Sequence, residues 1–325
     1  MGKKAIDNHV KRLLASRTCN PNDSFRTYNE IGAGEYGKVY KACLTDTCLN
    51  KIAVKNSGDN LSAEYLVTKR LEKLGVPQVY GYDRCSDRQF MFSEFINGVT
   101  LKDFLTKRRK RATDEELRSI ITQVLMILYT IQQKYPSFRH HDLHLDNIMV
   151  RRGLKVTLMD FGLASMDGVI NPIIRSQSFK SQYGIYPRSD RAYDVHLFLS
   201  SLYATRSLTQ GARRFIERTF DPRYLQKESA VVKEFRLRHD VDHTLPSIPT
   251  ILKDPYLAPP KNTVKAFINA LPPPKKNLVI AKKKSPVNQN KAKQKAMAVL
   301  KKVPEPKKKP VVKKLMRSPT KALTK

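Results

Sequence analysis

Acidic residues are scarce in this sequence. Its 325 residues include 29 Asp and Glu against 61 Lys and Arg, which gives a formal net charge of +32 at pH 7. The excess is unevenly spread, because residues 261–325 contain 20 basic residues and a single acid, and so carry a charge of +19. Such a balance disfavours cationic partners and favours polyanions such as nucleic acids or acidic proteins.

Cysteine and long apolar segments are also scarce. The four cysteines, Cys19, Cys43, Cys48 and Cys85, form no CxxC pair and have no His partner at zinc spacing, which argues against a zinc site. We expect them to be reduced thiols of an intracellular protein. The chain has no signal peptide and no apolar run long enough to span a membrane, so no membrane partner is expected.

Composition divides the chain into four segments. Residues 1–24 are short, polar and basic, and we expect either a poorly ordered arm or one short helix. Residues 25–96 have mostly strand patterns with one helix over 61–74, and residues 97–257 have mainly helical periodicity. Residues 258–325 are rich in Lys and Pro and cannot bury enough apolar surface to offset the entropy of ordering, which predicts a disordered basic tail.

The third segment contains clear helix and strand signals. Thr113 followed by Glu116 is a capping box, which predicts that a helix begins there. Apolar residues then recur at helical spacing as far as Ile131. Residues 148–150 and 156–159 are predicted to form a short β pair. The expected fold class is therefore α+β, with a small β-rich lobe and a larger helical lobe.

Three glycines lie between two predicted strands. Gly32, Gly34 and Gly37 have G-x-G-x-x-G spacing, and without Cβ atoms they let phosphate groups approach backbone N–H donors. A dinucleotide-binding loop would open a helix at this point, whereas here a strand follows from Val39. Lys55 ends the next apolar β segment, an unusual place for a residue type that normally lies at the surface.

A second group of motifs lies in the larger lobe. Asp142 and Asn147 occur in the stretch His-His-Asp-Leu-His-Leu-Asp-Asn, and Asp160-Phe161-Gly162 begins eighteen residues after Asp142. In this order and at this spacing, the motifs resemble those of the protein kinase superfamily. The resemblance covers about residues 25–255 and is nearest to the casein kinase one, vaccinia-related and haspin-like branches. It implies a bilobal kinase fold followed by the basic tail.

The resemblance also implies a role for each motif residue. Asp142 would accept the proton of the substrate hydroxyl, and Lys55 would hold the α- and β-phosphates of ATP while pairing with a helix carboxylate. Glu64 is favoured as that partner, with Glu72 as the rival. Asn147 and Asp160 would bind Mg²⁺. The implied ATP-binding residues are Ile31, Gly32, Gly34, Gly37, Val39, Ala53, Lys55, Ser93, Glu94 and Ile96.

Two departures from the family pattern concern regulation. His141 stands where regulated kinases have the Arg that pairs with phosphate on the activation loop. The Ala-Pro-Glu that usually closes the activation segment is missing, and residues 180–182 occupy its expected place. Asp194 resembles the buried Asp of the central helix in the larger lobe. We therefore predict that activity does not depend on activation-loop phosphorylation.

The function that the resemblance implies is ATP- and Mg²⁺-dependent phosphorylation of Ser or Thr hydroxyls on a protein substrate. One alternative is a small-molecule phosphotransferase of the aminoglycoside type, which shares Asp142 and Asp160 but not the glycine-rich loop. Another is a non-catalytic scaffold that binds nucleic acid through the tail. Intact Lys55, Asp142, Asn147 and Asp160 argue against the scaffold, which has no need of all four.

The remaining expectations concern partners and location. The tail is predicted to bind DNA, RNA or another polyanion. The run from Lys107 to Arg111 is interpreted either as a solvated face or as a contact for an acidic substrate or nucleic acid. We expect a monomer inside the cell, in the nucleus or associated with a virion. The sequence Pro306-Lys307-Lys308-Lys309 suggests the nucleus, because it resembles a nuclear import signal. A resemblance in composition to kinases of large DNA viruses suggests the virion.

Overall fold

The computed structural model describes residues 3–16, 19–34, 37–58, 61–176, 190–221, 224–225 and 245–258. The tail from residue 259, residues 180–182 and most of the segment between 222 and 244 lie outside the described residues. Expectations about the tail and about the end of the activation segment therefore stay predictions. None of the helices in the described part is long and apolar enough to cross a bilayer.

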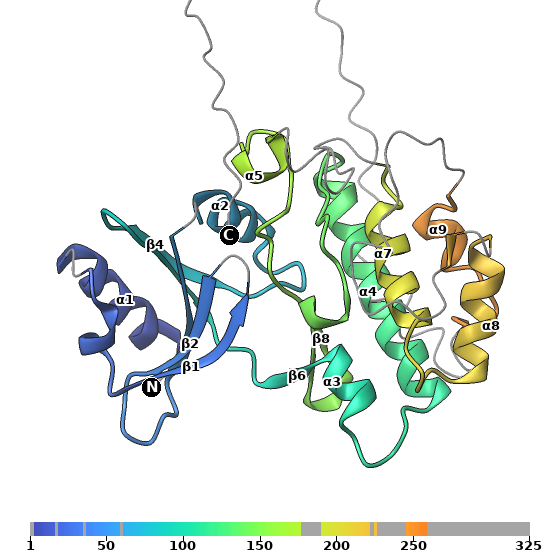
Figure 1. Cartoon of the computed structure of the whole chain (residues 1–325), viewed down its shortest axis with the longest axis horizontal. Helices are drawn as coiled ribbons and strands as arrows, with labels where there is room; N and C mark the ends of the chain where they lie inside the picture. The colour runs from blue at the N-terminus through green and yellow to red at the C-terminus, as the bar shows by residue number, and fades with distance from the viewer. Residues whose placement is uncertain are drawn as a thin grey trace, which may run out of the picture. The chain divides into compact units, whose positions relative to one another are not determined.

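The small lobe is built on a five-stranded antiparallel sheet (Figure 1). The order in the sheet is β1-β2-β3-β5-β4. Burial alternates along the start of β3 and of β4, whereas β1 is mostly exposed and the first four residues of β5 are all buried. The strands are β1 (Thr27–Gly34), β2 (Gly37–Cys43), β3 (Lys51–Ser57), β4 (Val79–Arg84) and β5 (Gln89–Glu94).

Helix α1 (Lys3–Ser16) packs on this sheet beside β4 (Figure 1). Val10 and Leu13 on its buried side belong to one apolar cluster with Ile52 and Val54 of β3. Gly81 of β4 permits the close approach, because a Cβ at this position would collide with the Leu14 side chain. Of the two alternatives considered for residues 1–24, the structure shows a helix, and this helix is part of the small-lobe core.

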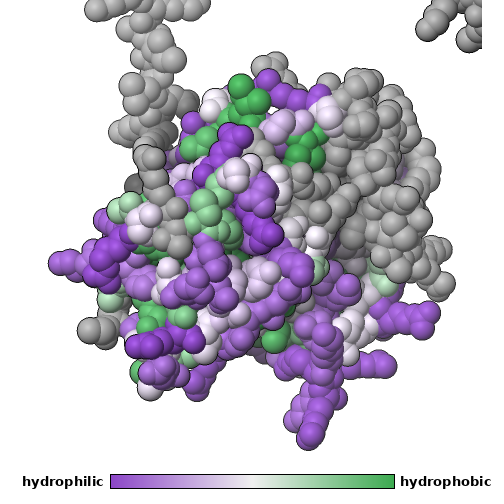
Figure 2. All heavy atoms as spheres, turned by 60° about the vertical axis from the view of Figure 1, so that its left-hand side comes forward, coloured by the Kyte–Doolittle hydropathy of each residue, from purple (hydrophilic) through white to green (hydrophobic). Residues whose placement is uncertain are grey.

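The surface of this side of the molecule is mostly hydrophilic, with small and separate hydrophobic patches (Figure 2). This agrees with an amphipathic α1 that turns its apolar residues towards the sheet and its charged residues towards solvent. Lys11, for example, is 67% exposed and pairs with Asp7 one turn earlier, at 2.7 Å.

Helix α2 (Ser62–Leu71) is shorter than the helix expected over residues 61–74. Two residues shortly after its end adopt left-handed backbone conformations, with φ of 71° at Lys73 and 83° at Gly75. A helix cannot continue through these angles, so the chain turns towards β4 instead. Glycine adopts such an angle at little cost, whereas the left-handed lysine is a conformation that sequence patterns do not reveal.

The larger lobe is mostly helical and encloses one large apolar core. The capping box is confirmed, since Thr113 Oγ1 accepts from the Glu116 N–H and Glu116 Oε2 accepts from the Thr113 N–H. The helices are α3 (Leu101–Thr106), α4 (Asp114–Lys134), α5 (Pro172–Arg175), α7 (Tyr193–Tyr203), α8 (Gln210–Thr219) and α9 (Ile248–Ile251). The 3-10 turns of this lobe are η2 (Leu145–Asn147) and η3 (Arg152–Leu154), and a further one, η1 (Pro21–Ser24), lies between α1 and β1.

A three-stranded sheet of order β6-β7-β8 lies at the start of this lobe. Its strands are β6 (Gly98–Thr100), β7 (Ile148–Arg151) and β8 (Val156–Leu158), and the β7–β8 pair is the one predicted from the sequence. Helix α3 packs against η2, so the chain that follows β6 supports the loop containing Asn147. Together the two lobes confirm the α+β bilobal fold.

The expectation of reduced thiols is wrong for this structure. All four cysteines are paired, Cys19 with Cys85 and Cys43 with Cys48. Cys19 follows α1 and Cys85 follows β4, so the packing of α1 on β4 brings together two residues that are 66 positions apart. Cysteine spacing along the chain does not contain this information, and that is why the sequence motif test missed it.

Candidate active site

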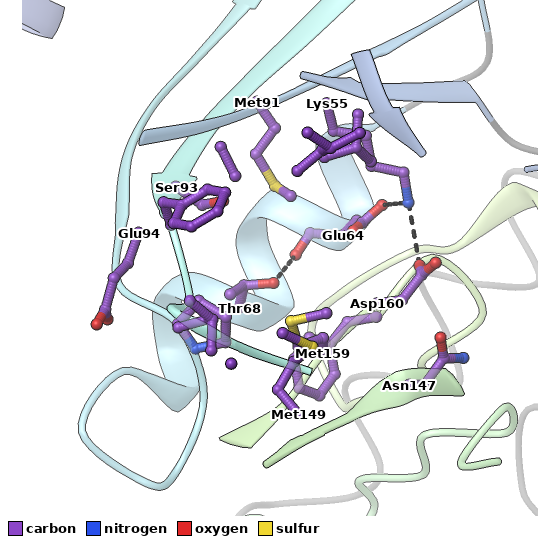
Figure 3. Close-up of a pocket in the computed structure, with 18 residues that line it drawn as sticks. Lys55, Glu64, Thr68, Met91, Ser93, Glu94, Asn147, Met149, Met159 and Asp160 are labelled. Atoms are coloured by element: carbon purple, nitrogen blue, oxygen red, sulfur yellow. Dashed lines mark hydrogen bonds and ion pairs between the residues drawn. The ribbon is translucent and has the colours of Figure 1, made fainter. Parts of the chain in front are cut away.

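A cavity of about 380 Å³ lies where the small-lobe sheet, α2 and the β7–β8 hairpin meet (Figure 3). Many of its lining residues are the ones that the family resemblance implies for ATP binding. Those lining residues are Ile31, Val39, Ala53, Lys55, Ser93, Glu94 and Ile96, together with Glu64, Asn147 and Asp160.

The cavity is also lined by residues that the sequence reasoning did not select. Thr68 lies one turn after Glu64 on α2 and donates to the Glu64 carbonyl, Met91 lies between Ser93 and Lys55, and Met149 and Met159 lie lower in the view (Figure 3). Met159 directly precedes Asp160, and Met149 follows Asn147 by two positions, so their positions close to motif residues were the available signal. Their thioethers give the site an apolar and adaptable wall.

Lys55 is the centre of the charged part of the site. Its Nζ donates to Glu64 Oε2 at 2.8 Å and to Asp160 Oδ1 at 3.0 Å (Figure 3). The Lys55 and Glu64 side chains are 10% and 5% exposed, whereas that of Asp160 is 45% exposed. The structure thus brings together one residue from β3, one from α2 and one from the segment after β8.

Glu72, the rival partner of Lys55, lies elsewhere. It directly follows α2, and its Oε1 accepts from the Lys69 Nζ at 3.2 Å and from the Val79 N–H at 3.0 Å. The ion pair with Lys55 therefore comes from Glu64, the favoured of the two candidates. The short linker between β3 and α2 does not prevent this pairing.

Protonation states in this triad follow from burial and charge. Burial lowers the pKa of Lys55, but the carboxylates of Glu64 and Asp160 more than compensate and hold that pKa above its usual value. For Asp160, burial acts to raise the pKa, and the Lys55 ammonium outweighs it, so the net shift is downward. Burial raises the pKa of Glu64. A protonated Lys55 beside an ionised Asp160 can bind phosphate and cation together.

Gly32, Gly34 and Gly37 are not among the residues that line the cavity, whereas Ile31 and Val39 on either side of them are. A Cβ at Gly32 or Gly34 would meet nothing within 4 Å, so open space lies beside this backbone. Gly37 has φ of 130°, and a Cβ there would collide with the backbone of Asn56. Glycine at 37 is thus required by the β2–β3 pairing, while glycines at 32 and 34 leave room for a phosphate chain.

Asp194 holds the loop that contains Asp142. Its two carboxylate oxygens accept from the His140 and His141 N–H groups, each at 2.8 Å, and its side chain is fully buried in α7. This fixes the backbone of His141, which has φ of 64°, and so determines the direction in which Asp142 emerges. His141 itself is buried, with Nε2 2.9 Å from the Ser165 hydroxyl.

Asp142 and Asn147 are also in direct contact. Asn147 Nδ2 donates to the Asp142 carbonyl at 2.8 Å and to Asp142 Oδ2 at 3.0 Å. His144 Nε2 lies 3.5 Å from Asp142 Oδ2. These contacts orient the Asp142 carboxylate, which is 21% exposed and so accessible to a hydroxyl.

The donor set on one side of the cavity fits magnesium. Asn147 uses its amide nitrogen for both contacts with Asp142, which leaves its Oδ1 as a ligand, and Asp160 has a second carboxylate oxygen beyond the one that contacts Lys55. Mg²⁺ prefers oxygen ligands and keeps phosphate and water oxygens in its shell. In the described part of the chain, no group of three His, Cys, Asp or Glu could hold a metal by itself. Phosphate oxygens would complete this site.

Comparison with known proteins agrees with this geometry. The family described as Protein kinase domain matches residues 25–171. A protein of Acanthamoeba polyphaga mimivirus named as a serine/threonine-protein kinase is 25% identical over 199 residues, which are 51% of this chain and 42% of the relative. Serine/threonine-protein kinase tousled-like 2 of Xenopus tropicalis is 29% identical over 164 residues, which are 45% of this chain and 23% of the relative.

A third relative, serine/threonine-protein kinase pakG of Dictyostelium discoideum, is 27% identical over 139 residues, which are 42% of this chain and 12% of the relative. This chain thus spans less than half the length of each of these three relatives. The matched region contains every motif from the glycine-rich segment to Asp160-Phe161-Gly162. In their fold, their motifs and these matches, residues 25–171 of the chain are similar to the eukaryotic-type protein kinase superfamily.

Proposed function

We propose that this protein transfers the γ-phosphoryl group of ATP to Ser or Thr hydroxyls of protein substrates, with Mg²⁺ as the metal. The observation that supports this most directly is the contact of Lys55 with both Glu64 and Asp160 in a cavity that Asn147 also lines. The three relatives described above are all named as serine/threonine-protein kinases, which supports the choice of substrate class.

Each of the site residues has a separate role in this reaction. Lys55 binds the α- and β-phosphates, and Glu64 holds the lysine in place. Asp142 orients the acceptor hydroxyl and takes its proton as the new P–O bond forms and the bond from the γ-phosphorus to the β-phosphate oxygen breaks. Asp160 and Asn147 would hold the magnesium, which neutralises charge on the transferred group.

The test is phosphoryl transfer from γ-labelled ATP to a mixture of proteins, with Asp160→Asn as the matched variant. We expect labelled phosphoserine and phosphothreonine with the natural chain and a loss of at least about 10³-fold with the variant, because a metal ligand is removed. Circular dichroism should show that the variant is folded. Equal labelling by the two proteins would contradict the proposal, and transfer to an aminoglycoside alone would favour the small-molecule alternative.

We also propose that the basic tail attaches the kinase to polyanions, on the basis of its +19 charge over residues 261–325. Such binding is driven by counterion release, so affinity for DNA should fall steeply with salt. A chain truncated after residue 261 should lose most of this binding and keep its activity on a short peptide. Unchanged DNA binding after truncation would instead assign the contact to the run from Lys107 to Arg111.

Location and assembly state are proposed on sequence grounds alone. We propose a monomer inside the cell, with the nucleus as the main site because of the lysine run at 307–309. Paired cysteines argue in the other direction, since disulfides seldom persist in reducing compartments. Counting free thiols in protein taken from cells and quenched at once would decide between the two.

A further inference from the structure

Arg70 connects α2 with the segment that follows Asp160-Phe161-Gly162. Its Nη1 donates to the Asp167 carbonyl at 2.8 Å, and its Nη2 donates to the Gly168 carbonyl at 3.2 Å. Gly168 has φ of 74°, and a Cβ there would lie 3.4 Å from the Arg70 guanidinium. The planar guanidinium of arginine presents two donors in a fixed geometry that suits two neighbouring acceptors, whereas the donors of a lysine share a single nitrogen.

The segment that receives Arg70 is itself fixed. Ser165 exchanges two backbone hydrogen bonds with Arg139, at 3.0 and 2.8 Å, beside the loop of Asp142. The Asp167 N–H donates to Ser137 Oγ at 2.9 Å. Asn171 Nδ2 donates to the Gly162 and Ala164 carbonyls at 2.8 and 3.0 Å. The two carbonyls that Arg70 binds are therefore held in place by the larger lobe.

A second contact reaches α2 at the same residue. The Tyr135 hydroxyl, at the end of α4, donates to the Arg70 carbonyl at 3.1 Å. Both the side chain and the backbone of Arg70 are thus bound by the larger lobe. Glu64, which pairs with Lys55, lies six residues before Arg70 on the same helix. At the usual rise per residue, the two positions are about 9 Å apart along the helix axis. Because a helix is stiff, fixing its last turn limits where Glu64 can lie.

We propose that Arg70 is a positioning residue that keeps Glu64 against Lys55, and that it does so through backbone carbonyls and without a phosphate. The proposal rests on the proposed kinase function. In kinases the Lys–Glu pair must be formed for transfer, and activation-loop phosphorylation commonly controls it. Here the acceptors are main-chain groups, which are present in every modification state of the protein. His141 in place of the phosphate-binding Arg is in keeping with this arrangement.

The main experiment is a double-mutant cycle of Arg70→Met and Glu64→Gln. Arg70→Met should lower kcat/KM about tenfold, which corresponds to 1.4 kcal/mol. In the Glu64→Gln background the same change should cost less than about twofold, because the arginine acts through the glutamate. Lys69→Met is the matched control. It removes the neighbouring exposed cation, which pairs with Glu72, and it should leave kcat/KM within twofold.

Two further readouts separate positioning from general loss of structure. Arg70→Lys, which keeps the charge but replaces the two donor nitrogens of the guanidinium by one, should recover part of the lost activity. Amide hydrogen exchange should rise in residues 62–71 of Arg70→Met and stay unchanged in the apolar cluster under α1. A full tenfold loss in the Glu64→Gln background, or activity within twofold of the natural chain in Arg70→Met alone, would overturn the proposal.

The affinity for ATP and Mg²⁺ distinguishes failure of this inference from failure of the kinase function. It is measured by calorimetry on the natural chain, the two single variants Arg70→Met and Glu64→Gln, and the double variant. If the natural chain transfers phosphate and Asp160→Asn does not, the kinase assignment stands whatever Arg70 does. If the natural chain transfers nothing, the inference is judged on nucleotide affinity instead. Arg70→Met should then weaken nucleotide binding only while Glu64 is present, and an equal weakening without Glu64 would overturn it.

Discussion

The two faces of the small-lobe sheet use alternate residues of the same strands for different purposes. On β3, Ile52 and Val54 are fully buried in the cluster under α1, whereas Ala53 and Lys55 line the cavity on the other face. One face stabilises the lobe, and the other supplies its chemistry. A change on the cavity face should therefore alter activity more than stability, and a change under α1 should do the reverse.

The largest effect is expected on the cavity face. Lys55→Met should lower kcat/KM by about 10³-fold, because the phosphates lose their cation and Glu64 loses its partner. Steady-state phosphorylation of a protein substrate measures this. Thermal unfolding should show a smaller change, since Glu64, whose pKa burial already raises, can take up a proton in place of the lost ion pair. Unfolding of the variant at ordinary temperature would break the comparison.

The next effect belongs to the face under α1. Leu13→Ala should lower the free energy of unfolding by about 3 kcal/mol, because it leaves a cavity in a cluster where Leu13 is 5% exposed. Denaturant titration measures the loss, and kcat/KM per folded molecule should be unchanged. Lys11→Ala is the control on the same helix and should cost less than about 0.5 kcal/mol, as exposed ion pairs do. A large loss of activity in folded Leu13→Ala would show that α1 also shapes the cavity.

The contrast between these faces also shows what sequence reasoning can reach. Local sequence patterns and motif spacing predict the strands, the capping box at Thr113 and the pocket residues from Val39 to Asp160. They do not predict contacts between elements that are distant in the sequence. The docking of α1 on β4, the pairing of Cys19 with Cys85 and the reach of Arg70 to Gly168 depend on tertiary packing. The end of α2 was misjudged because a left-handed Lys73 has no sequence signal.

A smaller effect should follow from the cysteines on the α1 side. Replacing Cys19 and Cys85 together by Ser should lower the unfolding free energy by about 2 kcal/mol, because the bond limits the freedom of the unfolded chain. Chemical denaturation with and without reductant measures this, and the double variant should no longer respond to reductant at this site. Activity should stay within twofold, since both residues lie away from the cavity lining. No difference in stability would indicate that these cysteines are not bonded in solution.

The smallest effect concerns pH and the cavity face. Lys55 holds the pKa of Asp160 below its usual value, so the folded state binds this proton less readily than the unfolded chain does. The stability that Asp160 contributes is therefore fully present above the unfolded pKa near 4 and is lost as pH falls through the lower folded value. The difference in unfolding midpoint between the natural chain and Asp160→Asn should shrink between pH 6 and pH 3, by a modest amount because Asp160 is partly exposed. Leu13→Ala should keep a constant offset over the same range, because no charge differs. If the difference in unfolding midpoint is also constant for Asp160→Asn, Lys55 and Asp160 are not coupled in solution. The stability of the cavity face would then respond to pH no more than that of the apolar face.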